Sequence, residues 1–151
     1  MKLPGNKKKL DEIFRSAEAP EVSEFNGEYE VDMLTGLPSL KKISHRKKFY
    51  ERDGKISGYN IVFKNLKWGR FFLEEGACED MGSPRTINPV RRELSNGVKI
   101  NYNRGENSFL TKHIRDFVRR VERDKLYLGR FYYKLGKKLL FLGYFSLKKI
   151  K

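Results

Sequence analysis

The residues best suited to metal or nucleophilic chemistry are few in this chain of 151 residues. Its soft ligands are His45, His113 and Cys78. A structural zinc site needs four such ligands, so the sequence predicts no metal site. A nucleophilic triad would need a histidine beside a Ser, Thr or Cys side chain, and no motif fixes such a pair. We therefore assign no catalytic residue, although His45 would be the first candidate if the protein were an enzyme.

Polar and aromatic groups on predicted strands are more informative. Arg70 shares one strand face with Trp68 and Phe72, while Gly69 and Phe71 belong to the other, and the sequence leaves open which face points inward. An inward Arg70 would need an anionic partner, from the protein or from a ligand head group. Buried tyrosines also need partners for their hydroxyl groups, and the tyrosines on predicted inner faces are Tyr29, Tyr59, Tyr102, Tyr127 and Tyr133. The candidate ligand-binding residues are Tyr29, His45, Tyr59, Trp68, Arg70, Tyr102 and Tyr133. The glycines form no phosphate-binding loop, and no cofactor is expected.

Charge and composition indicate which partners, location and domain number to expect. Lys and Arg number 33 against 19 acids, giving a net charge of +14. This excess favours either a well-solvated surface or an anionic partner such as nucleic acid, but the basic residues are spread along the chain. No apolar run is long enough to span a membrane. Cys78 is alone and no apolar signal core precedes Lys9, so we expect a cytoplasmic protein forming one domain over residues 1–151, with residues 1–9 flexible.

The last two predicted strands form a hairpin on which the other elements must pack. They span Leu126 to Leu135 and Leu139 to Leu147. A three-residue loop over 136–138 would set Gly129 opposite Phe145 and would align the two apolar faces. A two-residue Gly136-Lys137 turn of type II′ suits the turn chemistry better but loses that match. We favour the three-residue loop.

The rest of the chain is predicted to form six strands and two helices. Apolar spacing predicts a helix over Lys8 to Ala19, ended by Pro20, and a second over Leu110 to Val121. Eight antiparallel strands would close into an up-and-down β-barrel, so the predicted fold is mainly β with an N-terminal helix and a second helix before the last hairpin. The six earlier strands are Phe25 to Leu34, Leu40 to Arg52, Ile56 to Lys64, Lys67 to Glu74, Thr86 to Leu94 and Val98 to Asn103.

This layout resembles the calycins, which include lipocalins and fatty-acid-binding proteins. Phe25-Asn26-Gly27-Glu28-Tyr29 is similar to the first lipocalin strand, with Tyr29 where that family has Trp. The same strand, and the passage from Val121 to Gly129, also resemble small intracellular lipocalin-like proteins named for a Gly-x-Trp-x-Gly motif. The resemblance implies a barrel of eight to ten strands that binds a small hydrophobic or amphipathic molecule.

From these observations we expect non-enzymatic binding of a small apolar or amphipathic ligand, including an anionic one, inside the barrel. A basic nucleic-acid-binding barrel is the alternative, motivated by the net charge of +14. An enzyme of unspecified reaction is the third hypothesis. The sequence does not indicate an oligomeric state.

Overall fold

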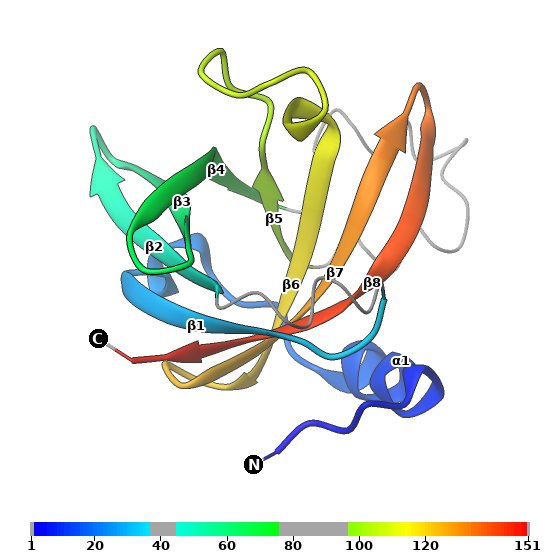
Figure 1. Cartoon of the computed structure of the whole chain (residues 1–151). Coiled ribbons are helices and arrows are strands. Elements are labelled where there is room, and N and C mark those ends of the chain that lie inside the picture. The colour runs from blue at the N-terminus through cyan, green and yellow to red at the C-terminus, as the bar shows by residue number, and fades with distance from the viewer. Residues whose placement is uncertain (1, 37–44, 76–96, 151) are drawn as a thin grey trace.

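The protein is a closed antiparallel β-barrel with one helix outside it (Figure 1). The structure, a computed structural model, describes residues 2–36, 45–75 and 97–150. Each strand pairs with its neighbour in sequence, and β1 pairs with β8 to close the barrel. This confirms the mainly β, up-and-down barrel and the N-terminal helix. The elements are α1 (Lys7–Ser16), η1 (Val22–Glu24), β1 (Gly27–Met33), β2 (His45–Arg52), β3 (Lys55–Val62), β4 (Leu66–Glu75), β5 (Val98–Asn101), η4 (Thr111–His113), β6 (Ile114–Glu122), β7 (Leu126–Leu135) and β8 (Lys138–Lys149).

The second predicted helix is wrong, because residues 114–122 form strand β6. The apolar residues of this segment repeat at helical spacing, but β6 turns Asp116 into the barrel and buries Arg119 beneath α1. With buried charges on both faces, the strand lacks the alternation of apolar and polar residues that would have identified it. The strand predicted for Thr86 to Leu94 lies outside the described residues.

The closing hairpin combines both registers considered from the sequence. Gly129 pairs with Phe145 and Phe131 with Gly143, as the three-residue loop predicts. Leu135 nevertheless pairs with Lys138, which leaves the two-residue turn Gly136-Lys137, with a positive φ of 60° at Gly136 as type II′ requires. A bulge reconciles the two, because the register shifts after Phe131 and leaves Leu142 as the extra residue on β8.

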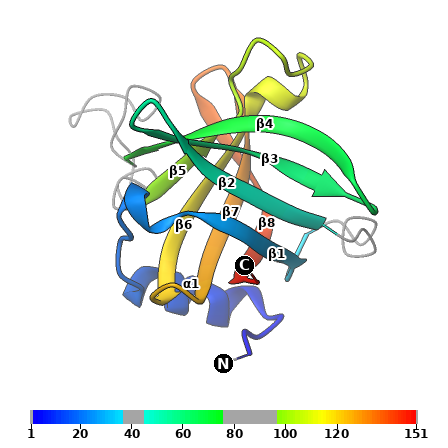
Figure 2. The same ribbon diagram turned by 90° about the vertical axis from the view of Figure 1, so that its left-hand side faces the viewer.

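Helix α1 covers the outer face of β6, β7 and β8 rather than an end of the barrel (Figures 1 and 2). Leu10 and Phe14 are buried there against Leu128 and Tyr144. Asp11 accepts a hydrogen bond from the Tyr144 hydroxyl at 2.5 Å. Within the segment 1–9, Lys7–Lys9 form the first turn of α1 and Leu3 is buried.

One end of the barrel interior is filled by aromatic side chains. Phe25 lies 4.8 Å from Tyr127 and 5.3 Å from Phe49, measured between ring centroids. Beside them, Glu24 at the end of η1 accepts hydrogen bonds from Arg120 and from the Tyr127 hydroxyl. This packing fills the interior around Phe25 with side chains.

Replacing Gly129 by Ala should destabilise the protein by about 2 to 3 kcal/mol, because overpacking a rigid core forces neighbours off their preferred geometry. A Cβ atom at Gly129 would lie 2.2 Å from the Phe145 ring. Urea unfolding measures the loss. Gly105→Ala is the matched control, since no atom lies within 4 Å of its added Cβ. Equal stabilities of the two variants would contradict this register.

Candidate functional site

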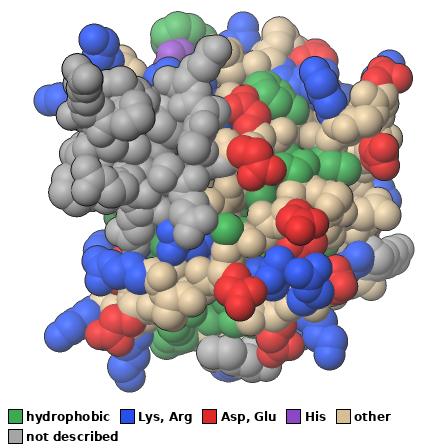
Figure 3. Space-filling model, turned by 180° about the vertical axis from the view of Figure 1, so that it is seen from behind, with side chains coloured by type: hydrophobic (Ala, Val, Ile, Leu, Met, Phe, Trp, Pro, Cys, Tyr) green, Lys and Arg blue, Asp and Glu red, His purple; other side chains and the backbone are tan. Residues whose placement is uncertain are grey.

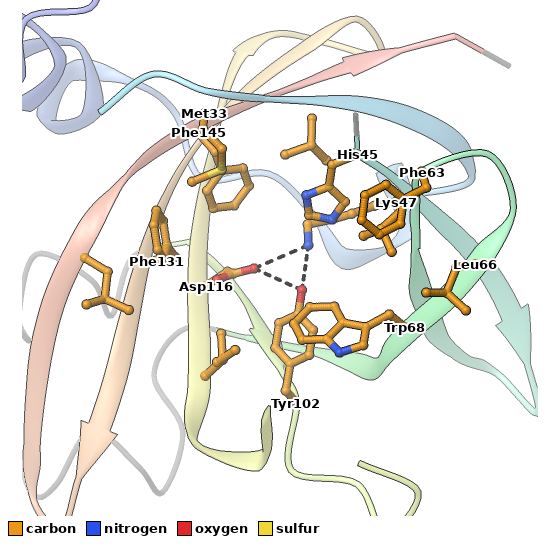
Figure 4. A pocket seen from close by; sticks show the side chains of 14 residues that line it. Met33, His45, Lys47, Phe63, Leu66, Trp68, Tyr102, Asp116, Phe131 and Phe145 are labelled. Atoms are coloured by element: carbon orange, nitrogen blue, oxygen red, sulfur yellow. Dashed lines mark hydrogen bonds and ion pairs between the residues drawn. The ribbon is translucent and has the colours of Figure 1, made fainter. Parts of the chain in front are cut away.

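A cavity of about 480 Å³ opens at the less filled end of the barrel (Figure 4). Its volume falls in the range of small-molecule sites. Phe63, Leu66 and Trp68 form part of its mouth and are 65%, 57% and 44% exposed, respectively. Ten of the fourteen lining residues are apolar, and the polar ones are gathered together. The lining residues are Val31, Met33, His45, Lys47, Val62, Phe63, Leu66, Trp68, Tyr102, Ile114, Asp116, Phe131, Leu142 and Phe145.

A lysine lies at the base of this cavity and is almost completely buried. Lys47 is 3% exposed, and its Nζ donates to Asn60 Oδ1 at 2.6 Å and to the Tyr102 hydroxyl at 2.5 Å. Asp116 Oδ2 lies 3.6 Å from the same Nζ and supplies the opposing charge. The ammonium also lies over the rings of Phe71 and Phe145, at 5.5 Å and 5.7 Å from their centroids. Burial of this charge is thus offset by an ion pair, two hydrogen bonds and aromatic faces.

The direction of most hydrogen bonds in this cluster is fixed by groups that can only donate or only accept. Asn60 Nδ2 donates to the carbonyl oxygen of Gly69 at 3.1 Å, which orients the amide. Asn60 Oδ1 therefore accepts from Lys47 and from Nε2 of His45. Tyr102 accepts from Lys47 and Asn60, which leaves its proton for Asp116 Oδ2 at 3.3 Å. His45 is consequently the tautomer with its proton on Nε2.

Burial shifts the pKa values of His45, Lys47 and Asp116 in the directions that favour their uncharged forms. It lowers the pKa of His45 to about 4, helped by the nearby Lys47 ammonium and opposed by the hydrogen bond to Asn60. It raises the pKa of Asp116 to about 6, although Lys47 and Tyr102 oppose the change. It lowers the pKa of Lys47, against the attraction of Asp116. Near neutral pH His45 is neutral, and Lys47 and Asp116 form an ion pair.

Three of the seven predicted ligand-binding residues meet at this cavity: His45, Trp68 and Tyr102. A bulge places Trp68 there. Tyr59 pairs with Arg70 and Asn60 with Trp68, so Gly69 is the extra residue of β4, with a φ of 61°. The expectation that Arg70 and Trp68 share a face is wrong, because this bulge turns them to opposite sides of the sheet.

The other four predicted residues lie away from the cavity. Arg70 stacks on the ring of Tyr59 at 5.6 Å, and Tyr59 packs against Tyr50 on the outer face, so the inward orientation expected for Tyr59 is wrong. Tyr29 is buried in the filled end of the barrel. Tyr133 stacks on His113 with ring centroids 5.8 Å apart. An anionic ligand held by Arg70 inside the barrel is thus not supported.

Sequence reasoning missed three members of the polar cluster: Lys47, Asn60 and Asp116. Lys47 was visible as a cation between His45 and Phe49 on one face of the predicted strand. Asn60 lies on the strand face opposite to Tyr59, and Tyr59 was the residue expected to point inward. Asp116 fell within the incorrectly predicted helix.

Residues 2–36, 45–75 and 97–150 give little support for a metal site, a membrane-spanning helix or a nucleic-acid-binding surface. No group of three or more His, Cys, Asp or Glu side chains there could hold a metal ion. Over the same residues, no helix is long and apolar enough to cross a membrane. On the face seen in Figure 3, Lys and Arg side chains lie among Asp and Glu side chains. This view offers no uniformly basic surface, and nucleic-acid binding stays a prediction based on net charge.

Comparisons with known proteins support the fold. No protein-family model and no curated protein match the sequence. Among solved structures, a protein from Thermomonospora curvata matches 97% of this chain and 88% of its own, with a TM-score of 0.58 and 16% sequence identity. Identity this low shows a shared barrel fold and does not transfer a function.

The shifted pKa values predict a pH-dependent effect of replacing His45 by Gln. Between pH 4 and 6.5 the unfolded chain holds a proton on His45 that the folded protein does not, so the free energy of unfolding rises with pH. The difference in unfolding free energy between wild type and His45→Gln should therefore grow by about 2 to 3 kcal/mol over this range. Denaturant titrations at several pH values measure it.

The titration of Asp116 changes the free energy of unfolding with pH in the opposite direction to that of His45. Its folded pKa of about 6 lies above the ordinary value of 3.8, so its contribution to stability falls as pH rises through 6. In wild type the two contributions partly cancel, whereas His45→Gln retains only the falling one. A wild-type minus variant difference that is constant with pH would contradict the assigned burial of His45.

Proposed function

We propose that the protein binds a small, largely apolar molecule in the barrel cavity and does not transform it. The observation that carries this proposal is a cavity of about 480 Å³ whose walls are apolar except for one cluster of hydrogen-bonded polar side chains. Apolar walls favour a ligand by removing its surface from water, at about 25 cal/mol for each Å² buried. A few converging polar groups at one end of such a cavity are typical of small-molecule sites.

The state of the polar cluster supports binding over catalysis. The Lys47 ammonium is bound by Asn60, Tyr102 and Asp116, so it is not available as an amine nucleophile. The Tyr102 hydroxyl donates to Asp116, and burial together with that carboxylate raises its pKa well above the ordinary value. Neither group is therefore prepared to take up a proton from a substrate near neutral pH.

A relationship to the calycins is part of this proposal. Support comes from the up-and-down order of eight strands, the helix before β1 and the interior cavity. Cytoplasmic location, suggested by the single Cys78, stays a prediction.

Binding can be followed with the chain's one tryptophan, because Trp68 lines the cavity. Diphenylhexatriene, a neutral hydrocarbon dye without a hydrogen-bond donor, should gain fluorescence in the cavity and accept energy from Trp68. Ile114→Phe fills part of the cavity and should weaken binding by about tenfold or more, since an overfilled site excludes the dye. Titration of the dye into each variant measures the dissociation constant.

Leu140→Phe is the matched control, because Leu140 is 52% exposed and lies outside the cavity. Its affinity for the dye should equal that of wild type, and both variants should retain the wild-type circular dichroism spectrum. The proposal would fail if the dye did not bind wild type, or if it bound equally well to Ile114→Phe.

A further inference from the structure

The polar end of the cavity offers acceptors but no donors to a ligand. Lys47 donates to Asn60 and Tyr102 and is ion-paired with Asp116; Tyr102 donates to Asp116, and Asn60 donates to Tyr102 and to the carbonyl oxygen of Gly69. Asp116 uses Oδ2 for both Tyr102 and Lys47, and across the described residues Oδ1 has no hydrogen-bond partner. Asp116 is 3% exposed and lines the cavity. Its free oxygen is thus a buried acceptor at the base of the ligand space.

His45 adds a second acceptor of the same kind. Its Nε2 donates to Asn60, which leaves a lone pair on Nδ1 that has no partner in the part of the chain that is described. His45 lines the cavity beside Lys47. Its low pKa, about 4 because of burial, keeps it neutral over the physiological range, so Nδ1 stays an acceptor.

The charges of the cluster add to zero. Lys47 contributes one positive charge and Asp116 one negative charge at a separation of 3.6 Å. A carboxylate ligand would meet the unpaired oxygen of Asp116 and find no free donor, which is costly in an apolar cavity. An ammonium ligand would meet the Lys47 charge. A neutral group that donates a hydrogen bond faces neither penalty.

We propose that the cavity selects a neutral apolar molecule bearing a hydrogen-bond donor, such as an alcohol, which donates to Asp116 Oδ1 or His45 Nδ1. This inference rests on the proposed function and specifies the chemistry of its ligand. It differs from the anionic ligand that the sequence suggested through Arg70, which stacks on Tyr59 outside the cavity. The apolar part of the molecule would contact the aromatic and aliphatic wall that includes Trp68 and Phe131.

Three probes with the same ten-carbon chain test the inference: decanol, decyl methyl ether and decanoate. Each is titrated into wild type while Trp68 emission is recorded, with calorimetry as a second readout. Decanol should bind about tenfold more tightly than the ether, because the ether displaces water from the acceptors without replacing its hydrogen bonds. Decanoate should bind at least about tenfold more weakly than decanol.

The outcomes distinguish a failure of this inference from a failure of the proposed function. Binding of decanoate or of the ether as tightly as decanol overturns the donor requirement while leaving cavity binding intact. The same inference is overturned if the neutral dye binds and none of the three probes does. If neither the dye nor any probe binds, cavity binding itself is wrong, and the inference falls with it.

Asp116→Asn provides a charge-specific check. The amide removes the repelling charge and supplies a donor, so decanoate should bind more tightly to this variant than to wild type, and the preference for decanol should shrink. Asp32→Asn is the control, because Asp32 lies on β1 with its side chain on the outer face, and its probe preference should equal that of wild type. An unchanged preference in a folded Asp116→Asn protein would overturn the role of Asp116.

Discussion

The buried ammonium of Lys47 is the constraint on which the barrel interior depends. A charge that is 3% exposed is tolerated only where partners compensate its lost hydration. Asn60 lies opposite Lys47 on the neighbouring strand β3, whereas Tyr102, directly after β5, and Asp116 on β6 come from across the barrel. Each of them has its own position fixed by another polar group. The cluster therefore links strands that are not neighbours and sets the chemistry at the base of the cavity.

The division of the interior into a filled and an open end follows from backbone geometry. At the filled end, aromatic rings occupy the spaces that glycines leave, as Phe71, packed on Phe49, does over Gly58. At the open end, two bulges redirect side chains: Gly69 brings Trp68 to the cavity mouth, and Leu142 is itself the bulged residue that lines the wall. A strand that bulges bends more strongly and re-aims its side chains. The filled end and the cavity thus both follow from local features of the strands, namely their glycines and their bulges.

The sequence was sufficient for the barrel but not for its site. Regular alternation such as Tyr29, Val31 and Met33 identified a half-buried strand, and β1 confirms it. The closing register could be predicted because each glycine needed a ring opposite it. The bulge at Gly69 could not, because it depends on tertiary closure of the barrel, and so Arg70 and Trp68 were wrongly expected to share a face. Asp116 was missed because a buried charge disrupts the apolar pattern that reveals a strand.

The most direct test of this account is a double-mutant cycle on Lys47→Met and Asp116→Leu, measured by urea unfolding near neutral pH. Each single variant should lose about 3 kcal/mol or more, because it leaves one buried charge unpaired. The double variant should lose distinctly less than the sum of the two, since it removes both charges together. Losses that simply add would show that the two residues do not interact, and would contradict a compensated ion pair at the base of the cavity.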